Sequence, residues 1–120
     1  MTTTHVTRYQ LSEKCDSTYC TLHIAGDYDT ARQVVREYAF QHGTCVQLAK
    51  VDYIYTGGEE AGITARFMAY PRFPKELHVL QHECESLALK LAPVLCQKSF
   101  SIETPVQTLY YTSTNSLHQK

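Results

Sequence analysis

The sequence has no tryptophan, no excess of charge and no long apolar run. The last two absences exclude classes of binding partner. Its 120 residues carry a net charge of −1, whereas binding of duplex nucleic acid needs a basic surplus. No basic run is present that would attach it to an anionic membrane. The longest apolar run, residues 87–96, is interrupted by Lys90 and Pro93 and is too short to span a bilayer. We therefore expect neither a duplex nucleic-acid partner nor a membrane partner.

Cysteine pairs of the CxxC type and a signal peptide are also missing. The five cysteines show no spacing typical of a metal site, and the first ten residues have neither a charged nor an apolar region. Both observations favour a reduced cytoplasmic protein with mostly buried thiols, although a disulfide between Cys15 and Cys20 is the alternative. We expect one domain, residues 1–120 with frayed tails at 1–4 and 114–120, that needs no cofactor to fold.

Alternating apolar residues predict six strands. The predicted strands cover residues 5–11, 19–25, 45–56, 63–70, 99–103 and 107–113. The alternation changes phase within the third strand, so we expect a bulge near Ala49 and Lys50. The glycine-rich residues 57–62 are expected to form a hairpin loop.

Two helices are predicted between these strands. The first runs from about residue 28 to 42, with Asp27 as its N-terminal cap and Gly43 as its C-terminal stop. The second has Pro74 in its first turn, carries an apolar stripe, and is kinked or ended by Pro93. The order ββαββαββ predicts an α+β fold: a ferredoxin-like βαββαβ core with an extra strand at each end and two helices on one face of an antiparallel sheet. The open face of such a sheet is where small domains of this kind bind ligands or dimerise.

The first candidate site is the loop that holds Gly57, Gly58, Glu59 and Glu60. Glycines permit close approach of a ligand to the backbone. The two carboxylates would repel an anion, but they could bind a cation or the hydroxyl and amino edges of a ligand. The segment is no phosphate-binding P-loop, because it lacks Gly-Lys-Ser/Thr and joins two antiparallel strands. A hairpin tip with solvated acids remains the alternative.

The second candidate site combines Arg66 and Arg72 with Tyr70 and Phe73. Arginine offers a planar fork that matches phosphate or carboxylate and stacks on aromatic rings. Two prolines bracket the Arg72–Phe73 corner, which reduces the entropy that binding would cost. In the alternative interpretation, Phe73 packs against the start of the second helix while the arginines pair with nearby glutamates.

Other clusters are weaker candidates. His78, His82 and Glu85 share one helix face and could hold a metal, but no fourth ligand is evident, so we interpret them as a solvated face and predict no metal. Cys20 and His23 are predicted on opposite strand faces, so we predict no catalytic thiol–imidazole pair. Five tyrosines could form a stacking platform or a dimer contact if their strands face solvent, and core burial is the alternative for about half of them. They are Tyr53, Tyr55, Tyr70, Tyr110 and Tyr111.

Two strings, IYTGGEEAG at residues 54–62 and YPRFP at residues 70–74, are similar to stretches of small uncharacterised proteins encoded by bacteriophages and prophages. This resemblance implies an accessory protein acting in the cytoplasm of an infected bacterium. Phage proteins of this size are often inhibitors or sequestering proteins rather than enzymes.

From these observations we expect a non-enzymatic binding protein that captures a small anionic ligand such as a nucleotide. The arginines would hold phosphate, and Tyr70 and Phe73 would stack on the base. Because residues 62–70 would span about 25–30 Å as a strand, loop and corner would meet on one ligand only in a homodimer or higher oligomer. Two alternatives remain: a protein-interaction module that inhibits a host factor, and a small hydrolase or transferase with Glu59 or Glu60 as general base.

Overall fold

The structure is a computed structural model and describes residues 8–114. Seven elements follow one another in the order βαββαββ. They are β1 (Tyr19–Ala25), α1 (Tyr28–His42), β2 (Gln47–Tyr55), β3 (Gly58–Met68), α2 (Leu77–Val94), β4 (Ser99–Glu103) and β5 (Thr108–Thr112).

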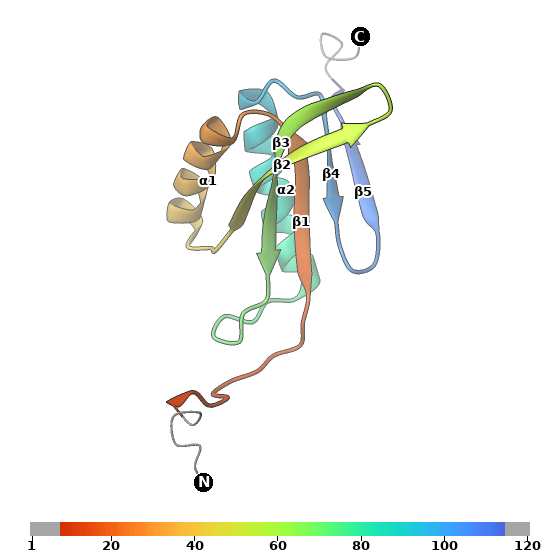
Figure 1. The fold of residues 1–120 in the computed structure, drawn as a ribbon. Helices are drawn as coiled ribbons and strands as arrows, with labels where there is room; N and C mark the ends of the chain where they lie inside the picture. Colours follow the sequence, from red (N-terminus) through yellow and green to blue (C-terminus); the bar gives the residue numbers. More distant parts are fainter. Residues whose placement is uncertain (1–7, 115–120) are drawn as a thin grey trace.

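The five strands form one open antiparallel sheet in the order β2-β3-β1-β4-β5. Both helices cover the same face of this sheet, and no described helix or strand covers the opposite face (Figure 1). The first four strands and the two helices have the ferredoxin-like arrangement, and β5 extends the sheet beside β4. The predicted α+β fold, with a ferredoxin-like core and an additional strand, is therefore confirmed.

Helix α1 begins and ends where the sequence predicts. The carboxylate of Asp27 accepts a hydrogen bond from the backbone N–H of Thr30 at 2.9 Å, which satisfies one of the free donors of the first turn. Gly43 adopts the left-handed conformation, with φ of 62°, and its N–H bonds the carbonyl of Ala39. Both ends of the helix are thus fixed by local chemistry.

The core lies between the helices and the sheet. Cys20, Leu22 and Ile24 alternate along β1 and point at the helices with at most 2% of their surface exposed, because successive strand residues face opposite sides. Phe67 from β3 and Leu87 from α2 complete the centre of this layer. The intervening residues of the same strands therefore form the open face.

The strand predicted at residues 5–11 does not form in its described part. Residues 8–11 are fully exposed and belong to no strand, and residues 5–7 lie outside the described residues. Residues 8–11 pack on no buried surface, so nothing offsets the entropy of ordering them as a strand. The additional strand of the described chain is β5.

The β2–β3 hairpin differs from its predicted form in two ways. Its two strands pair one to one from Gln47–Arg66 to Tyr55–Gly58, so no bulge is present near Ala49. The phase change has another cause: the first half of β2 faces the helices and the second half faces the open side. The turn contains only Thr56 and Gly57, with φ of 87° at Gly57, so most of the predicted loop 57–62 is strand.

Helix α2 starts three residues later than predicted. Pro74 precedes the helix, Glu76 occupies its N-terminal cap position without a side-chain cap bond, and Pro93 lies inside its last turn. Leu80, Leu87 and Leu91 of its apolar stripe are buried, as the spacing predicted. Neither helix is long and apolar enough to cross a membrane within residues 8–114.

Candidate functional site

The open face of the sheet is polar and aromatic, in contrast to the helix-covered face. Strand pairing sets its side chains in rows across the sheet. One row runs Arg66, Thr21, Glu103, and the next runs Thr64, His23, Ser101, Tyr110. These residues come from four strands far apart in the sequence. Strand pairing therefore brings together titratable and hydrogen-bonding groups on this face that form no motif in the sequence.

A pocket of about 220 Å³ opens on this face near the distal end of the hairpin. In Figure 1, β2 and β3 extend past the end of β1 and swing toward β4 and β5. The lining residues of the pocket are His23, Ile24, Ala25, Tyr53, Glu60, Gln97, Ser99, Phe100, Ser101 and Tyr110. We call this hollow the open-face pocket. It combines two tyrosine side chains, a carboxylate, an imidazole and serine hydroxyls, with no lysine or arginine among its lining residues.

The wall that Tyr53 forms depends on Gly62. A Cβ at Gly62 would lie 2.5 Å from Cε2 of Tyr53 and 2.7 Å from the carbonyl oxygen of Ile24. Glycine therefore lets the ring lie flat over β3, where the hydroxyl of Tyr53 donates to the carbonyl oxygen of Ile63 at 2.6 Å. Burial raises the pKa of the Tyr53 hydroxyl, so the phenol stays protonated and keeps this bond.

His23 and Glu103 form the polar pair of the open face. Nε2 of His23 lies 2.9 Å from Oε1 of Glu103. His23 pairs with Ser101 across the strands, so Glu103 reaches it from the neighbouring row. With 32% and 44% of their side chains exposed, both groups remain accessible to a ligand. The pair can orient one ring nitrogen and leave the other free to bond a ligand group.

Arg66 lies apart from the open-face pocket. Its guanidinium carbon sits 4.9 Å from the ring centroid of Tyr19, and Nη1 is 3.7 Å from the sulfur of Met68. The six residue steps from Glu60 to Arg66 correspond to roughly 20 Å of strand. Arg66 therefore gives the opposite end of the open face a positive charge. It makes no ion pair with the described residues, contrary to the alternative that paired it with a glutamate.

The Pro-bracketed corner forms a second hollow, of about 260 Å³. Tyr70 and Phe73 close a tight turn through a 2.9 Å bond from the N–H of Phe73. Lys75 pairs with Glu83 at 2.6 Å on one side, and the hydroxyl of Tyr70 accepts from Gln47 at 3.2 Å on the other. Phe73 is 69% exposed. It does not pack against the start of α2, as one interpretation of the sequence had it. We call this hollow the corner pocket.

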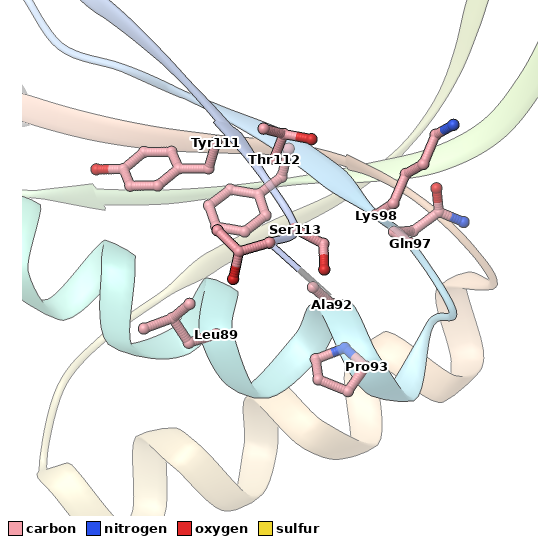
Figure 2. A pocket seen from close by; sticks show the side chains of 10 residues that line it. Leu89, Ala92, Pro93, Gln97, Lys98, Tyr111, Thr112 and Ser113 are labelled. Carbon is pink, nitrogen blue, oxygen red and sulfur yellow. The ribbon is translucent and has the colours of Figure 1, made fainter. Parts of the chain in front are cut away.

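A third hollow, of about 350 Å³, lies on the helix side between α2 and the outer strands. Figure 2 shows Leu89 and Pro93 of α2 on one side of it and the end of β5 on the other. It exists because α2 packs on β1, β3 and β4 but leaves much of β5 uncovered. Tyr111 stacks on Phe100 at 4.8 Å here, so it belongs to the helix side and not to a solvent-facing platform. Apolar residues of α2 and β4 line this hollow together with the polar residues Gln97, Lys98, Thr112, Ser113 and Thr114.

The predicted site residues divide between the two ends of β3. Gly57, Gly58, Glu59 and Glu60 lie at the hairpin end, and Tyr70, Arg72 and Phe73 at the corner end (Figure 1). Only Glu60 lines the open-face pocket. Glu59 points to the other side of the hairpin, because adjacent strand residues alternate.

Sequence reasoning missed the His23–Glu103 pair. The two residues are 80 positions apart, so no spacing rule connects them. Alternation did place His23 opposite the apolar side chains of β1, and it placed Phe100 and Ile102 of β4 inward, which leaves Glu103 outward. The missing information was that β1 and β4 are neighbours in the sheet.

The described histidines and cysteines form neither a metal cluster nor a disulfide. No group of three or more His, Cys, Asp or Glu side chains within residues 8–114 could hold a metal ion, and Glu85 accepts a hydrogen bond from Tyr111. All five cysteines are free, so the alternative Cys15–Cys20 disulfide is wrong. Only Cys20 and Cys84 are buried. The expectation of mostly buried thiols is thus met by two of five.

Comparison with known proteins gives one result. No protein-family model matches the chain, and no curated protein matches it significantly. The fold is similar to that of a phage SAM lyase. The structure of that lyase in complex with S-methyl-5′-thioadenosine matches with a TM-score of 0.62 at 10% sequence identity, over 87% of this chain and 97% of the lyase. Its apo state matches with a TM-score of 0.57 at 11% identity, over 88% of this chain and 98% of the lyase.

This similarity corrects the expectation of a non-enzymatic binding protein. The two similar structures are of a lyase, which is an enzyme, and one of them holds S-methyl-5′-thioadenosine. The expected non-enzymatic function, and the preference for a protein without catalysis, are therefore wrong. Two coarser expectations are supported: the similar structures are phage proteins, and a small ligand is a fitting partner.

Proposed function

We propose that this protein is an enzyme that cleaves S-adenosylmethionine, a sulfonium nucleoside. The observation that carries the proposal is the fold likeness to a phage SAM lyase, which extends over 87% of this chain and 97% of the lyase. At 10% identity the likeness by itself concerns the fold, so the function has to be supported by the chemistry of this chain's own surface.

The open-face pocket supports the proposal through its side chains. A positively charged sulfur is attracted to the faces of aromatic rings, which Tyr53 and Tyr110 provide. The carboxylate of Glu60 adds a favourable charge. Ribose hydroxyls can bond Ser101 and the His23–Glu103 pair. We assign the substrate site to this pocket.

We take the ligand of the similar lyase structure, S-methyl-5′-thioadenosine, as the nucleoside product of the reaction. S-methyl-5′-thioadenosine keeps both the methyl and the adenosyl group on sulfur. The bond from sulfur to the amino-acid carbon therefore breaks, and its electron pair stays on sulfur. We propose that the substrate's own carboxylate oxygen attacks that carbon as the bond breaks. A five-membered lactone and the neutral thioether result, without transfer of a proton. The enzyme then contributes mainly by orienting the carboxylate and excluding water.

We also propose that the working form is a homo-oligomer. The open-face pocket, at about 220 Å³, is smaller than the roughly 300–1,000 Å³ of sites that enclose drug-sized ligands. A second copy can complete it. Ile54 and Tyr55 are 74% and 54% exposed at the end of the hairpin, and the corner pocket carries the exposed Phe73 beside Arg72. We propose that hairpin and corner meet between copies. Arg66, Arg72, Tyr70, Phe73 and the hairpin residues 57–60 would then border one shared site.

The likeness to phage proteins supports a proposal about where the protein acts. We propose that the chain is phage-encoded and acts in the cytoplasm of the infected bacterium, where S-adenosylmethionine is available as substrate.

The test is turnover in a matched pair of tyrosine variants. Purified protein is incubated with S-adenosylmethionine, and S-methyl-5′-thioadenosine is measured by chromatography with mass detection. Tyr110→Ala removes an exposed ring from the open-face pocket and should lower kcat/KM about tenfold. Tyr9→Ala removes a ring that is 90% exposed outside the sheet and should leave it unchanged. Absence of turnover in the unmodified protein would remove the proposal. An equal effect of both variants would remove the assignment of the pocket.

A further inference from the structure

The open-face pocket is lined by a negative charge and by no lysine or arginine. The negative charge is the carboxylate of Glu60. Within residues 8–114 Glu60 makes no ion pair, so its charge is not neutralised by a neighbour. The positive charge of Arg66 is turned away toward Tyr19 and Met68. Within one copy, a cation at this end of the sheet meets a carboxylate and aromatic rings.

We propose that the open-face pocket recognises the positive charge on the substrate's sulfur, and that the carboxylate of Glu60 provides this recognition. The neutral thioether product then binds more weakly and is released. This inference rests on the proposed function and specifies how the same site separates substrate from product. Substrate and product share the adenosyl group and the methyl group, so shape distinguishes them poorly at the sulfur. The charge on sulfur differs by one full unit, and Glu60, Tyr53 and Tyr110 of the pocket attract the charged form.

The physical basis is the charge on sulfur, which is +1 in the sulfonium substrate and zero in the thioether product at any pH. A sulfonium near a carboxylate gains Coulomb energy that a thioether cannot gain. A cation over a tyrosine ring gains a similar amount from the ring quadrupole. Because Glu60 is exposed, water and salt screen its contribution. We therefore expect about a tenfold preference for the charged ligand, and a smaller preference at high ionic strength.

The role of Glu60 differs from that of a general base. The positive charge on sulfur diminishes as the bond breaks, so Glu60 stabilises the bound substrate more than the transition state. Glu60→Gln should raise KM for S-adenosylmethionine and leave kcat equal or higher. A general base at this position would give the opposite split, with kcat lost. Glu60 is exposed in a strand, so the variant is expected to fold.

The experiment compares two ligands that the reaction cannot consume. S-adenosylhomocysteine is a neutral thioether, and sinefungin has an amine-bearing carbon in place of the methylated sulfur and is positively charged at neutral pH. Both are titrated by calorimetry into the unmodified protein, Glu60→Gln and Glu37→Gln. Glu37 is an exposed residue of α1 on the other layer, bonded to Gln33 at 3.0 Å, and serves as the matched control.

The proposal expects sinefungin to bind about tenfold more tightly than S-adenosylhomocysteine in the unmodified protein and in Glu37→Gln. In Glu60→Gln the two affinities should become similar. Equal affinities in the unmodified protein, with S-adenosylmethionine still cleaved, overturn charge recognition and leave the proposed function standing. A preference that survives Glu60→Gln overturns the role of Glu60. If neither ligand binds and no cleavage occurs, the proposed function and this inference both fall.

Discussion

Replacing Gly62 with alanine tests the wall of the open-face pocket most sharply. The added Cβ would lie 2.5 Å from Tyr53 and 2.7 Å from the carbonyl oxygen of Ile24, and the latter belongs to the backbone and cannot move away freely. Overpacking of this kind costs about 1–3 kcal/mol, and displacing the ring also breaks its bond to Ile63, worth about 1 kcal/mol. Alanine returns about 0.5–1 kcal/mol by restricting the unfolded chain. The net loss is about 2 kcal/mol.

Urea unfolding followed by circular dichroism measures this loss. Gly58→Ala is the matched control, because its nearest contact is Tyr55 at 3.2 Å, a half-exposed ring that can move. That variant should change the free energy of unfolding by less than about 0.5 kcal/mol. In a Tyr53→Ala background the cost of Gly62→Ala should fall by about 1 kcal/mol, since the ring clash is gone. Equal costs for the Gly62 and Gly58 variants, or no coupling to Tyr53, would refute this account of the wall.

Further predictions concern the helix side and the corner. Burial and the carboxylate of Glu85 raise the pKa of Tyr111, so its stabilising effect is complete below the unfolded pKa of about 10 and is lost as pH rises beyond it. Tyr111→Phe should therefore cost about 1 kcal/mol at neutral pH and make the decline in unfolding free energy above pH 10 less steep; parallel pH curves for the two proteins would contradict this. Phe67→Ala should cost about 3–5 kcal/mol, whereas Phe73→Ala should cost less than about 0.5 kcal/mol and shift the sedimenting species toward monomer. An unchanged mass for Phe73→Ala would exclude the corner as an interface between copies.

The sequence predicts those parts of the fold whose causes are local. Helix α1 follows from a capping aspartate, an apolar face and a terminal glycine within 17 consecutive positions, 27–43. Strand β1 follows from the alternation of apolar Cys20, Leu22 and Ile24 with polar Thr21 and His23. The order of the elements then restricts the topology to a ferredoxin-like sheet, because short connections and right-handed crossovers leave few other arrangements.

The errors have equally physical causes. Glycine and glutamate composition favoured a long loop at 57–62, but one glycine in a two-residue turn is enough to keep β2 and β3 paired in register. The phase change in β2 suggested a bulge, whereas a strand that leaves the core can bury one side in its first half and the other in its second. Within the strand predicted at 5–11, the described residues 8–11 pair with no other strand and are exposed.

The candidate site was predictable only in fragments. Glu60 was singled out for its charge and Tyr53 and Tyr110 for their rings, but nothing in the sequence joins them to His23. Their meeting depends on the curvature of the hairpin and on β4 pairing with β1. Tertiary placement of this kind carries no local signal. For the same reason the arginines, which have the most specific side-chain chemistry, drew the prediction to the other end of the sheet.

The most direct test of the central claim follows one labelled methyl group. Protein is incubated with S-adenosylmethionine that carries ¹³C in the methyl on sulfur, and all nucleoside and four-carbon products are identified by mass. The account predicts that every label appears in S-methyl-5′-thioadenosine, formed in equal amount with an unlabelled lactone. Unlabelled nucleoside product, label transferred to another molecule, or intact substrate after prolonged incubation would contradict it.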